Sequence, residues 1–256
     1  MSGAERALFY LNFIAEVILI GRLIQCRLHQ TYRSLFLYWL VQALATLVIL
    51  PVNIYTRPYL YMYLTAQTIF ILMAVFVVQD LYRIALSEHP AVATFGRQSL
   101  LAAMILAALL ALSGLTLDST ILPGHYPAIH RFATFERTMN FVALVFLLLI
   151  GGLLVWFPIK VRRNIVVYLS GFVLFSAARS FGILLINLLP QAATRLLSTI
   201  MLGLTLVSLL VWIIGIRPEG ERVTATPGHR RDPETMQRLN RQLDAINTAL
   251  ARFVRH

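Results

Sequence analysis

Charged residues are scarce in this chain. Asp, Glu, Lys and Arg make up 13% of its 256 residues, whereas hydrophobic residues make up 59%. A soluble domain of this size carries roughly 25% charged residues. Several apolar runs are also long enough to cross a bilayer, which takes about 20 residues. The composition therefore excludes an ordinary soluble domain and predicts an all-α, polytopic membrane protein in contact with the lipid bilayer.

The chain also lacks most residues on which metal and cofactor chemistry depends. It has one cysteine, Cys26, which excludes an intrachain disulfide and a thiolate metal cluster. Its one lysine, Lys160, falls in a polar turn and not in the last apolar run, where a retinal Schiff base would need it. All six histidines fall in predicted loops or in the tail, which argues against a membrane-embedded zinc site or histidine-ligated haem. We expect no metal and no cofactor.

Sequence motifs typical of catalysis are missing as well. The chain contains no H-E-x-x-H, no G-x-S-x-G and no phosphate-binding P-loop. No nucleophile, base and metal ligand are spaced as a catalytic group would need. We therefore expect a protein without enzymatic activity of its own.

What the chain has is a series of apolar segments. Hydropathy predicts seven transmembrane helices, at residues 7–25, 34–54, 59–84, 98–117, 138–158, 164–189 and 195–216. With the N-terminus outside, sixteen basic residues lie on the cytoplasmic side and five lie outside. The positive-inside rule favours this orientation, with a cytoplasmic C-terminus. The net charge of +11 then acts as an orientation signal in a bacterial plasma (inner) membrane, and we expect no nucleic acid partner.

Three parts of the chain follow from this pattern. Residues 1–216 are predicted to form a seven-helix transmembrane bundle, residues 217–231 a flexible basic linker, and residues 232–256 a cytoplasmic amphipathic helix. The short matches "NFIA" at 12–15 and "NFVA" at 140–143 also suggest a duplicated arrangement of three helices, a linking helix and three more.

Arg179 lies in the middle of the sixth apolar run. A charge at the bilayer centre costs roughly 2.5–3.5 kcal/mol on the insertion scale, so the side chain should face protein or water. Glu16 lies at a similar predicted depth in the first run. The sequence therefore predicts a buried Glu16–Arg179 pair.

Other polar residues recur at helical spacing around these two charges. The predicted cluster consists of Asn12, Glu16, Gln42, Thr46, Thr65, Thr68, Ser176, Arg179 and Asn187. Most of these residues fall in the outer half of the membrane, where they would form a pocket open toward the outside. The same residues could also serve only to fix how the helices pack, and the sequence leaves both interpretations open.

The tail carries a second pattern. Apolar residues recur at alternating steps of three and four: Met236, Leu239, Leu243, Ile246, Leu250 and Phe253. Such an a/d pattern over about three heptads predicts a helix with one apolar face, which binds a partner or a copy of itself. The alternative is a helix that lies on the inner membrane surface.

Three non-catalytic functions fit these features. The first is a sensor or scaffold module whose tail helix engages a protein partner. The second is a small-solute transporter with a polar site near Glu16 and Arg179, which the internal duplication would suit. The third is an accessory subunit of a larger membrane complex.

Overall fold

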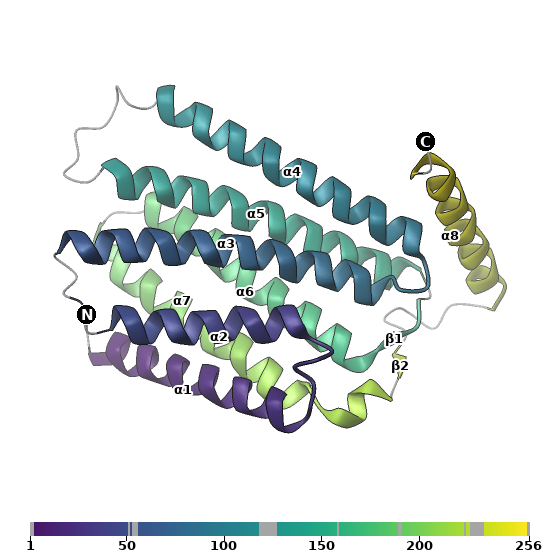
Figure 1. Cartoon of the computed structure of the whole chain (residues 1–256), viewed down its shortest axis with the longest axis horizontal. Helices are drawn as coiled ribbons and strands as arrows, with labels where there is room; N and C mark the ends of the chain where they lie inside the picture. Colours follow the sequence, from purple (N-terminus) through teal and green to yellow (C-terminus); the bar gives the residue numbers. More distant parts are fainter. Residues whose placement is uncertain are drawn as a thin grey trace.

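The fold is a bundle of long helices. The computed structural model describes residues 3–50, 52, 56–117, 127–157, 159–188, 191–222, 224–225 and 233–254. The bundle helices are α1 (Gly3–Gln25), α2 (Arg33–Ile49), α3 (Arg57–Ala85), α4 (Pro90–Leu117), α5 (Pro127–Trp156), α6 (Arg163–Leu188) and α7 (Gln191–Gly215). Successive helices run in opposite directions, side by side (Figure 1). The prediction of an all-α protein is confirmed.

The remaining elements lie at the end of the bundle opposite the N-terminus (Figure 1). They are the two-residue strands β1 (Val161–Arg162) and β2 (Thr224–Ala225), the short 3₁₀ helix η2 (Pro218–Glu221) and the tail helix α8 (Pro233–Val254). Both η2 and β2 fall within the predicted linker. We refer to the two ends of the bundle as the N-terminal end, where α1 begins, and the α8 end.

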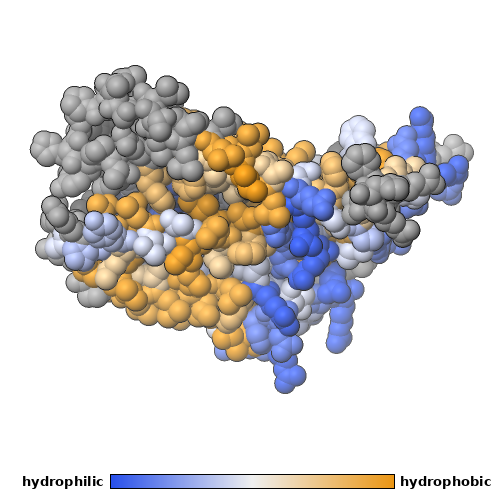
Figure 2. Space-filling model, turned by 45° about the horizontal axis from the view of Figure 1, so that its top comes forward, coloured by the Kyte–Doolittle hydropathy of each residue, from blue (hydrophilic) through white to orange (hydrophobic). Residues whose placement is uncertain are grey.

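The outer surface of the bundle is hydrophobic. Apolar side chains cover much of the face seen in Figure 2, while hydrophilic ones gather toward one end. Within the described chain, six helices are long and apolar enough to cross a membrane, namely α1, α3, α4, α5, α6 and α7. The α2 helix is also apolar but has only 17 residues. These features are those of a multi-pass membrane protein, because an exterior of this kind is solvated by lipid tails.

Several helices extend beyond the apolar runs that predict them. The α4 helix begins at Pro90 and the α5 helix at Pro127, well before the predicted starts at 98 and 138. Proline is favoured at the first helical position, because the first amide of a helix has no partner within it. Helix α5 therefore includes His130 and Glu136, which the predicted spans left in a loop. Helix α2 ends earlier than predicted, at Ile49, since Pro51 in the sequence has no amide hydrogen to continue it.

An aromatic cluster fills the centre of the bundle between α2, α6 and α7. It consists of Tyr38, Trp39, Phe172, Phe175 and Trp212, each of them almost fully buried. Neighbouring rings in this cluster lie 5.3–5.9 Å apart between centroids, mostly in edge-to-face geometry. Such pairs add about 0.5–1.5 kcal/mol each beyond the area they bury.

Gly171 allows helices α6 and α7 to approach each other closely beside the aromatic cluster. The indole of Trp212 packs onto Gly171, and a Cβ atom added at that glycine would lie 2.4 Å from the indole Nε1. The same Nε1 donates a hydrogen bond to the backbone carbonyl of Tyr168, at 3.2 Å. The α6 and α7 helices can therefore pack this closely only if position 171 has no side chain.

We expect Gly171→Ala to destabilise the bundle by about 1–3 kcal/mol, because the added methyl group displaces Trp212 from its hydrogen bond. Thermal unfolding of the purified protein in detergent, followed by tryptophan fluorescence, measures the change.

Gly152→Ala provides the matched control. This glycine lies within α5, and nothing lies within 4 Å of the Cβ that alanine would add. Alanine favours a helix over glycine by roughly 0.5–1 kcal/mol, so the control should be neutral or slightly stabilising. Equal effects at positions 152 and 171 would contradict the proposed role of the close approach.

Candidate functional site

A pocket of about 410 Å³ opens between α1, α2 and α3 near the N-terminal end. This volume lies within the roughly 300–1,000 Å³ typical of small-molecule sites. The apolar part of its wall includes Phe9 and Phe70. Seven side chains with polar groups also line this N-terminal pocket: Arg6, Tyr10, Gln42, Thr46, Tyr59, Tyr63 and Gln67.

A buried ion pair lies directly behind one wall of the pocket. The Arg179 guanidinium on α6 donates from Nη2 to the Glu136 carboxylate on α5 and, at 2.8 Å, to Oε1 of Gln67 on α3. The Glu136 side chain is only 4% exposed. Because Gln67 also lines the pocket, one amide joins the pocket to the charge pair.

This arrangement shows what accommodates an arginine within the sixth helix. The Cζ atom of Arg179 also lies 5.9 Å from the centroid of the Phe175 ring, in cation–π geometry. The side chain faces protein, as its predicted depth requires. A carboxylate, an amide oxygen and an aromatic face replace the water that the guanidinium would otherwise need.

The predicted Glu16–Arg179 pair is wrong, because the acidic partner of Arg179 is Glu136. Glu136 was missed because the fifth predicted span starts at residue 138, two residues after it. The helix continues into a more polar stretch, where the carboxylate turns inward. Gln67 lies within the third predicted span, next to Thr68, and no pattern in the sequence distinguished it.

The residues of the predicted polar cluster do not all lie together in the structure. Gln42 and Thr46 line the N-terminal pocket as expected. Thr65 and Thr68 are exposed instead, and the Thr68 hydroxyl donates to the carbonyl of Leu64 in its own helix. Successive residues of an α-helix are about 100° apart, since 3.6 residues make a turn, so Thr68 points away from the pocket that Gln67 lines.

The predicted cluster also includes Ser176 and Asn187, which are on the same helix as Arg179. The Ser176 side chain is buried, with 4% of the residue exposed. The Asn187 side chain lies outside the described residues.

Asn12 faces α7, and neither Asn12 nor Glu16 lines the N-terminal pocket. The Asn12 amide donates to the carbonyls of Leu8, at 2.9 Å, and of Leu202, at 3.0 Å. Glu16 is 5% exposed, and its Oε2 has no hydrogen-bond partner among the described residues. The structure therefore separates the two charges that the sequence had paired.

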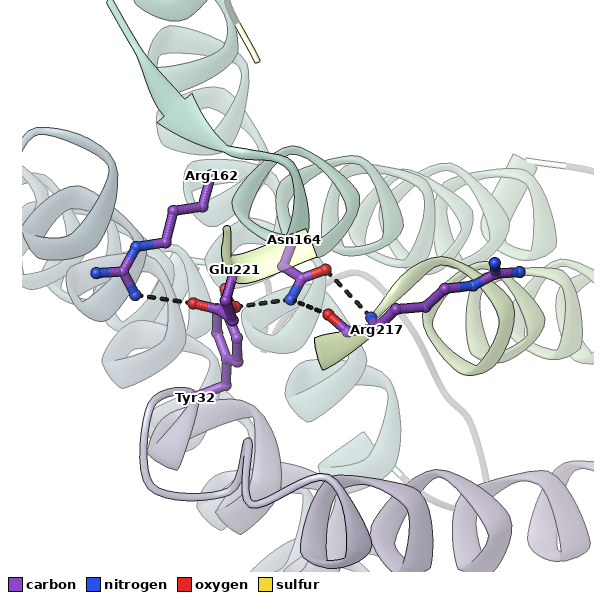
Figure 3. A network of polar contacts seen from close by, with 5 residues as sticks. All are labelled: Tyr32, Arg162, Asn164, Arg217 and Glu221. Carbon is purple, nitrogen blue, oxygen red and sulfur yellow. Dashed lines mark hydrogen bonds and ion pairs between the residues drawn. The ribbon is translucent and has the colours of Figure 1, made fainter. Parts of the chain in front are cut away.

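A second polar network closes the α8 end of the bundle (Figure 3). The carboxylate of Glu221 accepts hydrogen bonds from the Tyr32 hydroxyl at 2.6 Å, from the Asn164 amide at 2.6 Å and from the Arg162 guanidinium at 2.8 Å. Asn164 is fully buried and also bonds both the N–H and the carbonyl of Arg217. This network joins the turn after α1, the start of α6 and the segment that follows α7.

Burial works against the ionised carboxylate of Glu221, but its three hydrogen-bond donors and the charge of Arg162 outweigh that cost. The pKa of this carboxyl therefore lies below its ordinary value of 4.5. Burial and the neighbouring Glu221 carboxylate both raise the pKa of Tyr32, which keeps its hydroxyl protonated as a donor. The charge of Glu221 is thus part of what holds the segment after α7 in place.

Helix α8 packs against the start of α4. The side-chain oxygen of Asn247 accepts the backbone N–H groups of Ala91 at 3.0 Å and Val92 at 3.3 Å, and so caps the first turn of α4. Within the predicted apolar face, Leu239 and Leu243 are buried, Leu250 is partly buried and Ile246 is 44% exposed. The side chains of Met236 and Phe253 lie outside the described residues. In this state, part of the predicted partner-binding face contacts the chain's own bundle.

Known proteins provide no further guide: no protein-family model matches the chain, and neither a curated protein nor a solved structure matches it significantly.

We expect Arg179→Gln or Glu136→Gln alone to destabilise the protein by about 3–5 kcal/mol, since either change leaves an unpaired charge inside the bundle. The double variant should lose less stability than the sum of the two single variants. Denaturant or thermal unfolding in one detergent measures all four members of the cycle.

Glu16→Gln is the control for this cycle. Combined with Arg179→Gln, it should show a much weaker coupling than Glu136→Gln shows, because Glu16 and Arg179 are not paired. Strong coupling of residue 179 to residue 16, with none to Glu136, would contradict the observed pair.

Acid should loosen the segment after α7 in a way that depends on Glu221. A carboxyl group with a lowered pKa in the folded state contributes stability that is complete above pH 4.5 and is lost as the pH falls further. Amide hydrogen-exchange protection of residues 216–222, corrected for intrinsic exchange, should therefore fall below pH 4.5. The Glu221→Gln variant should show weaker protection at neutral pH and little further change in acid. The same acid response in both proteins would assign it to other groups.

Proposed function

We propose that this chain is a seven-helix membrane sensor that binds a small polar solute in the N-terminal pocket and signals through its cytoplasmic tail. The observation that carries the proposal is Gln67, which lines the pocket and also holds the partly buried Arg179 guanidinium. A solute that binds this amide changes the surroundings of a buried charge.

The proposed topology has α2 as the seventh span, the N-terminus outside and α8 in the cytoplasm. With 17 residues, α2 is at the lower limit of about 17–25 residues for a transmembrane helix. The distribution of sixteen basic residues inside against five outside supports the orientation. In a plasma membrane, the N-terminal pocket then opens to the exterior.

The chemistry of the pocket favours a solute that carries both charge signs, such as an amino acid. Arg6 supplies a cation at the pocket wall for a carboxylate. Gln42 supplies a buried Oε1 with no hydrogen-bond partner among the described residues, and this oxygen can accept from an ammonium group. Tyr59 and Tyr63, whose stacked rings lie 6.3 Å apart between centroids, can pack against the solute's side chain.

Helix α6 provides the proposed route through the membrane. Asn164 lies at the start of this helix and Arg179 in its second half, fifteen residues or roughly 22 Å away. Asn164 holds Arg217 and Glu221, which precede the tail. A small shift of α6 that follows binding at Gln67 would therefore act on the segment that leads to α8.

The proposed output is the release of α8. Leu239 and Leu243 are buried against the chain itself, so a partner can use this face only after α8 leaves α4. The contact involves a few leucines, the Asn247 cap and an approach of 3.6 Å between His89 Nε2 and Asp244 Oδ1, a set small enough to be reversible.

A transporter is the second candidate, and Glu16 favours it. A buried carboxylate oxygen without a hydrogen-bond partner is expensive inside a membrane and is typical of proton or ion pathways. Uptake of solute into proteoliposomes would select this alternative over the sensor.

The experiment is thermal unfolding in lipid nanodiscs with a panel of free amino acids, compared with monocarboxylates and monoamines. An amino acid that binds stabilises the folded state by about 2.7 kcal/mol at 100 times its Kd. The Gln42→Leu variant should lose this stabilisation. Thr65→Val, on the exposed face of α3, is the matched control and should retain it. No stabilisation by any member of the panel, or equal stabilisation in both variants, would contradict the proposed site.

The signalling step needs a second readout in the same nanodiscs. In a Cys26→Ser background, spin labels at positions 94 on α4 and 248 on α8 report the distance between the two helices. The sensor proposal expects this distance to increase when the stabilising amino acid is added. An unchanged distance together with solute binding would point to transport or to an accessory role.

A further inference from the structure

A second cavity, of about 400 Å³, lies near the α8 end between α2, α3 and α4. Its lining combines three arginines with a wall of apolar side chains. The arginines are Arg33, Arg83 and Arg97, and the apolar residues include Leu37, Met73 and Phe76. We refer to it as the arginine cleft.

The cations of the cleft lie at one level of the bundle. Arg33 is the first residue of α2, Arg83 is in the last turn of α3 and Arg97 is in the early part of α4. Helix termini of a membrane protein lie near the lipid headgroups, where phosphate groups are the abundant anions. The three arginines are thus at the depth of lipid phosphates in either orientation of the protein.

The cleft has an excess of positive charge. Its one acidic lining residue, Asp80, is already occupied, because it accepts a hydrogen bond from Ser34 at 2.6 Å and pairs with Arg83. Arg33 and Arg97 form no ion pair with the described residues. The Nε of Arg97 is buried and has no hydrogen-bond partner among them. Two guanidinium groups therefore remain free for an anion.

The apolar wall of the cleft faces the lipid. Leu37 is 47% exposed and Phe76 is 55% exposed, on helices whose outer surface is hydrophobic. A free phosphate would make no use of this wall, whereas a lipid acyl chain would lie along it. Arginine suits the headgroup, because its planar guanidinium binds phosphate oxygens in a bidentate manner.

We propose that the arginine cleft binds one anionic glycerophospholipid, with its phosphate between Arg33 and Arg97 and an acyl chain against Leu37 and Phe76. The bound lipid contacts α2, α3 and α4 together. It also lies beside Asp80, whose partner Ser34 is in hydrogen-bond contact with the Tyr168 hydroxyl of α6 at 3.1 Å.

The experiment is native mass spectrometry of the full chain in detergent, with phosphatidylglycerol and phosphatidylcholine added in equal amounts. We expect one phosphatidylglycerol to be retained in preference to phosphatidylcholine. Arg33→Gln with Arg97→Gln should reduce this preference by roughly fivefold for each arginine, given the usual contribution of a basic residue near anionic lipid.

A matched control removes two charges from the same end of the bundle. Lys160 and Arg163 are both exposed and do not line the cleft, so Lys160→Gln with Arg163→Gln should retain the specific lipid. Arg97→Lys preserves the charge but not the bidentate geometry, and should give an intermediate preference. It also serves as the test if the double cleft variant does not fold.

Three outcomes would overturn the proposal. Equal retention of the two lipids by the wild-type protein would remove the preference for an anion. Equal losses in the cleft and control variants would indicate diffuse attraction to a basic surface. Displacement of phosphatidylglycerol by inorganic phosphate alone would show that the cleft binds phosphate without using its apolar wall.

Discussion

The contact on which the rest of the structure depends is the ion pair between Glu136 and Arg179. An arginine among apolar helices needs partners to replace most of its water, and a buried charge without a partner would destabilise the fold by several kcal/mol. Glu136 and Gln67 meet this requirement from two other helices. The pair therefore determines how α3, α5 and α6 approach one another at the N-terminal end, and it places a polar wall beside the adjoining pocket.

Along α6, Phe172 and Phe175 lie between Asn164 and Arg179, so two polar networks flank the aromatic core. Glu136 and Arg179 lie toward one end, whereas Asn164 and Glu221 tie the chain together at the other. Tyr38 and Trp212 belong to the core in the middle. This separation is what a bilayer favours, because polar groups there must be paired while apolar rings need only be packed. Helix α6 contributes residues to both polar networks and to the aromatic core. A structural change in either network would therefore act on the same helix.

The helical class and most spans could be predicted from hydropathy, because the burial of apolar residues in lipid dominates the energy of this chain. The depth of Arg179 likewise indicated that it faces protein or water and not lipid. Its partner was not predictable in the same way. Glu136 precedes the apolar run, and only the extension of α5 back to Pro127 brings it inside the bundle. Packing of α8 onto α4 was also missed, because heptad spacing defines an apolar face without saying what covers it.

The short α2 helix lines both the N-terminal pocket and the arginine cleft. It has 17 residues, or roughly 25 Å, beside α3 with 29 residues, or roughly 43 Å. Gln42 and Thr46 lie toward one end of α2 in the N-terminal pocket, while Arg33 begins the helix at the other, in the arginine cleft. The two proposed ligands therefore share this helix, so a shift of α2 against α3 would act on the solute site and on the lipid site together.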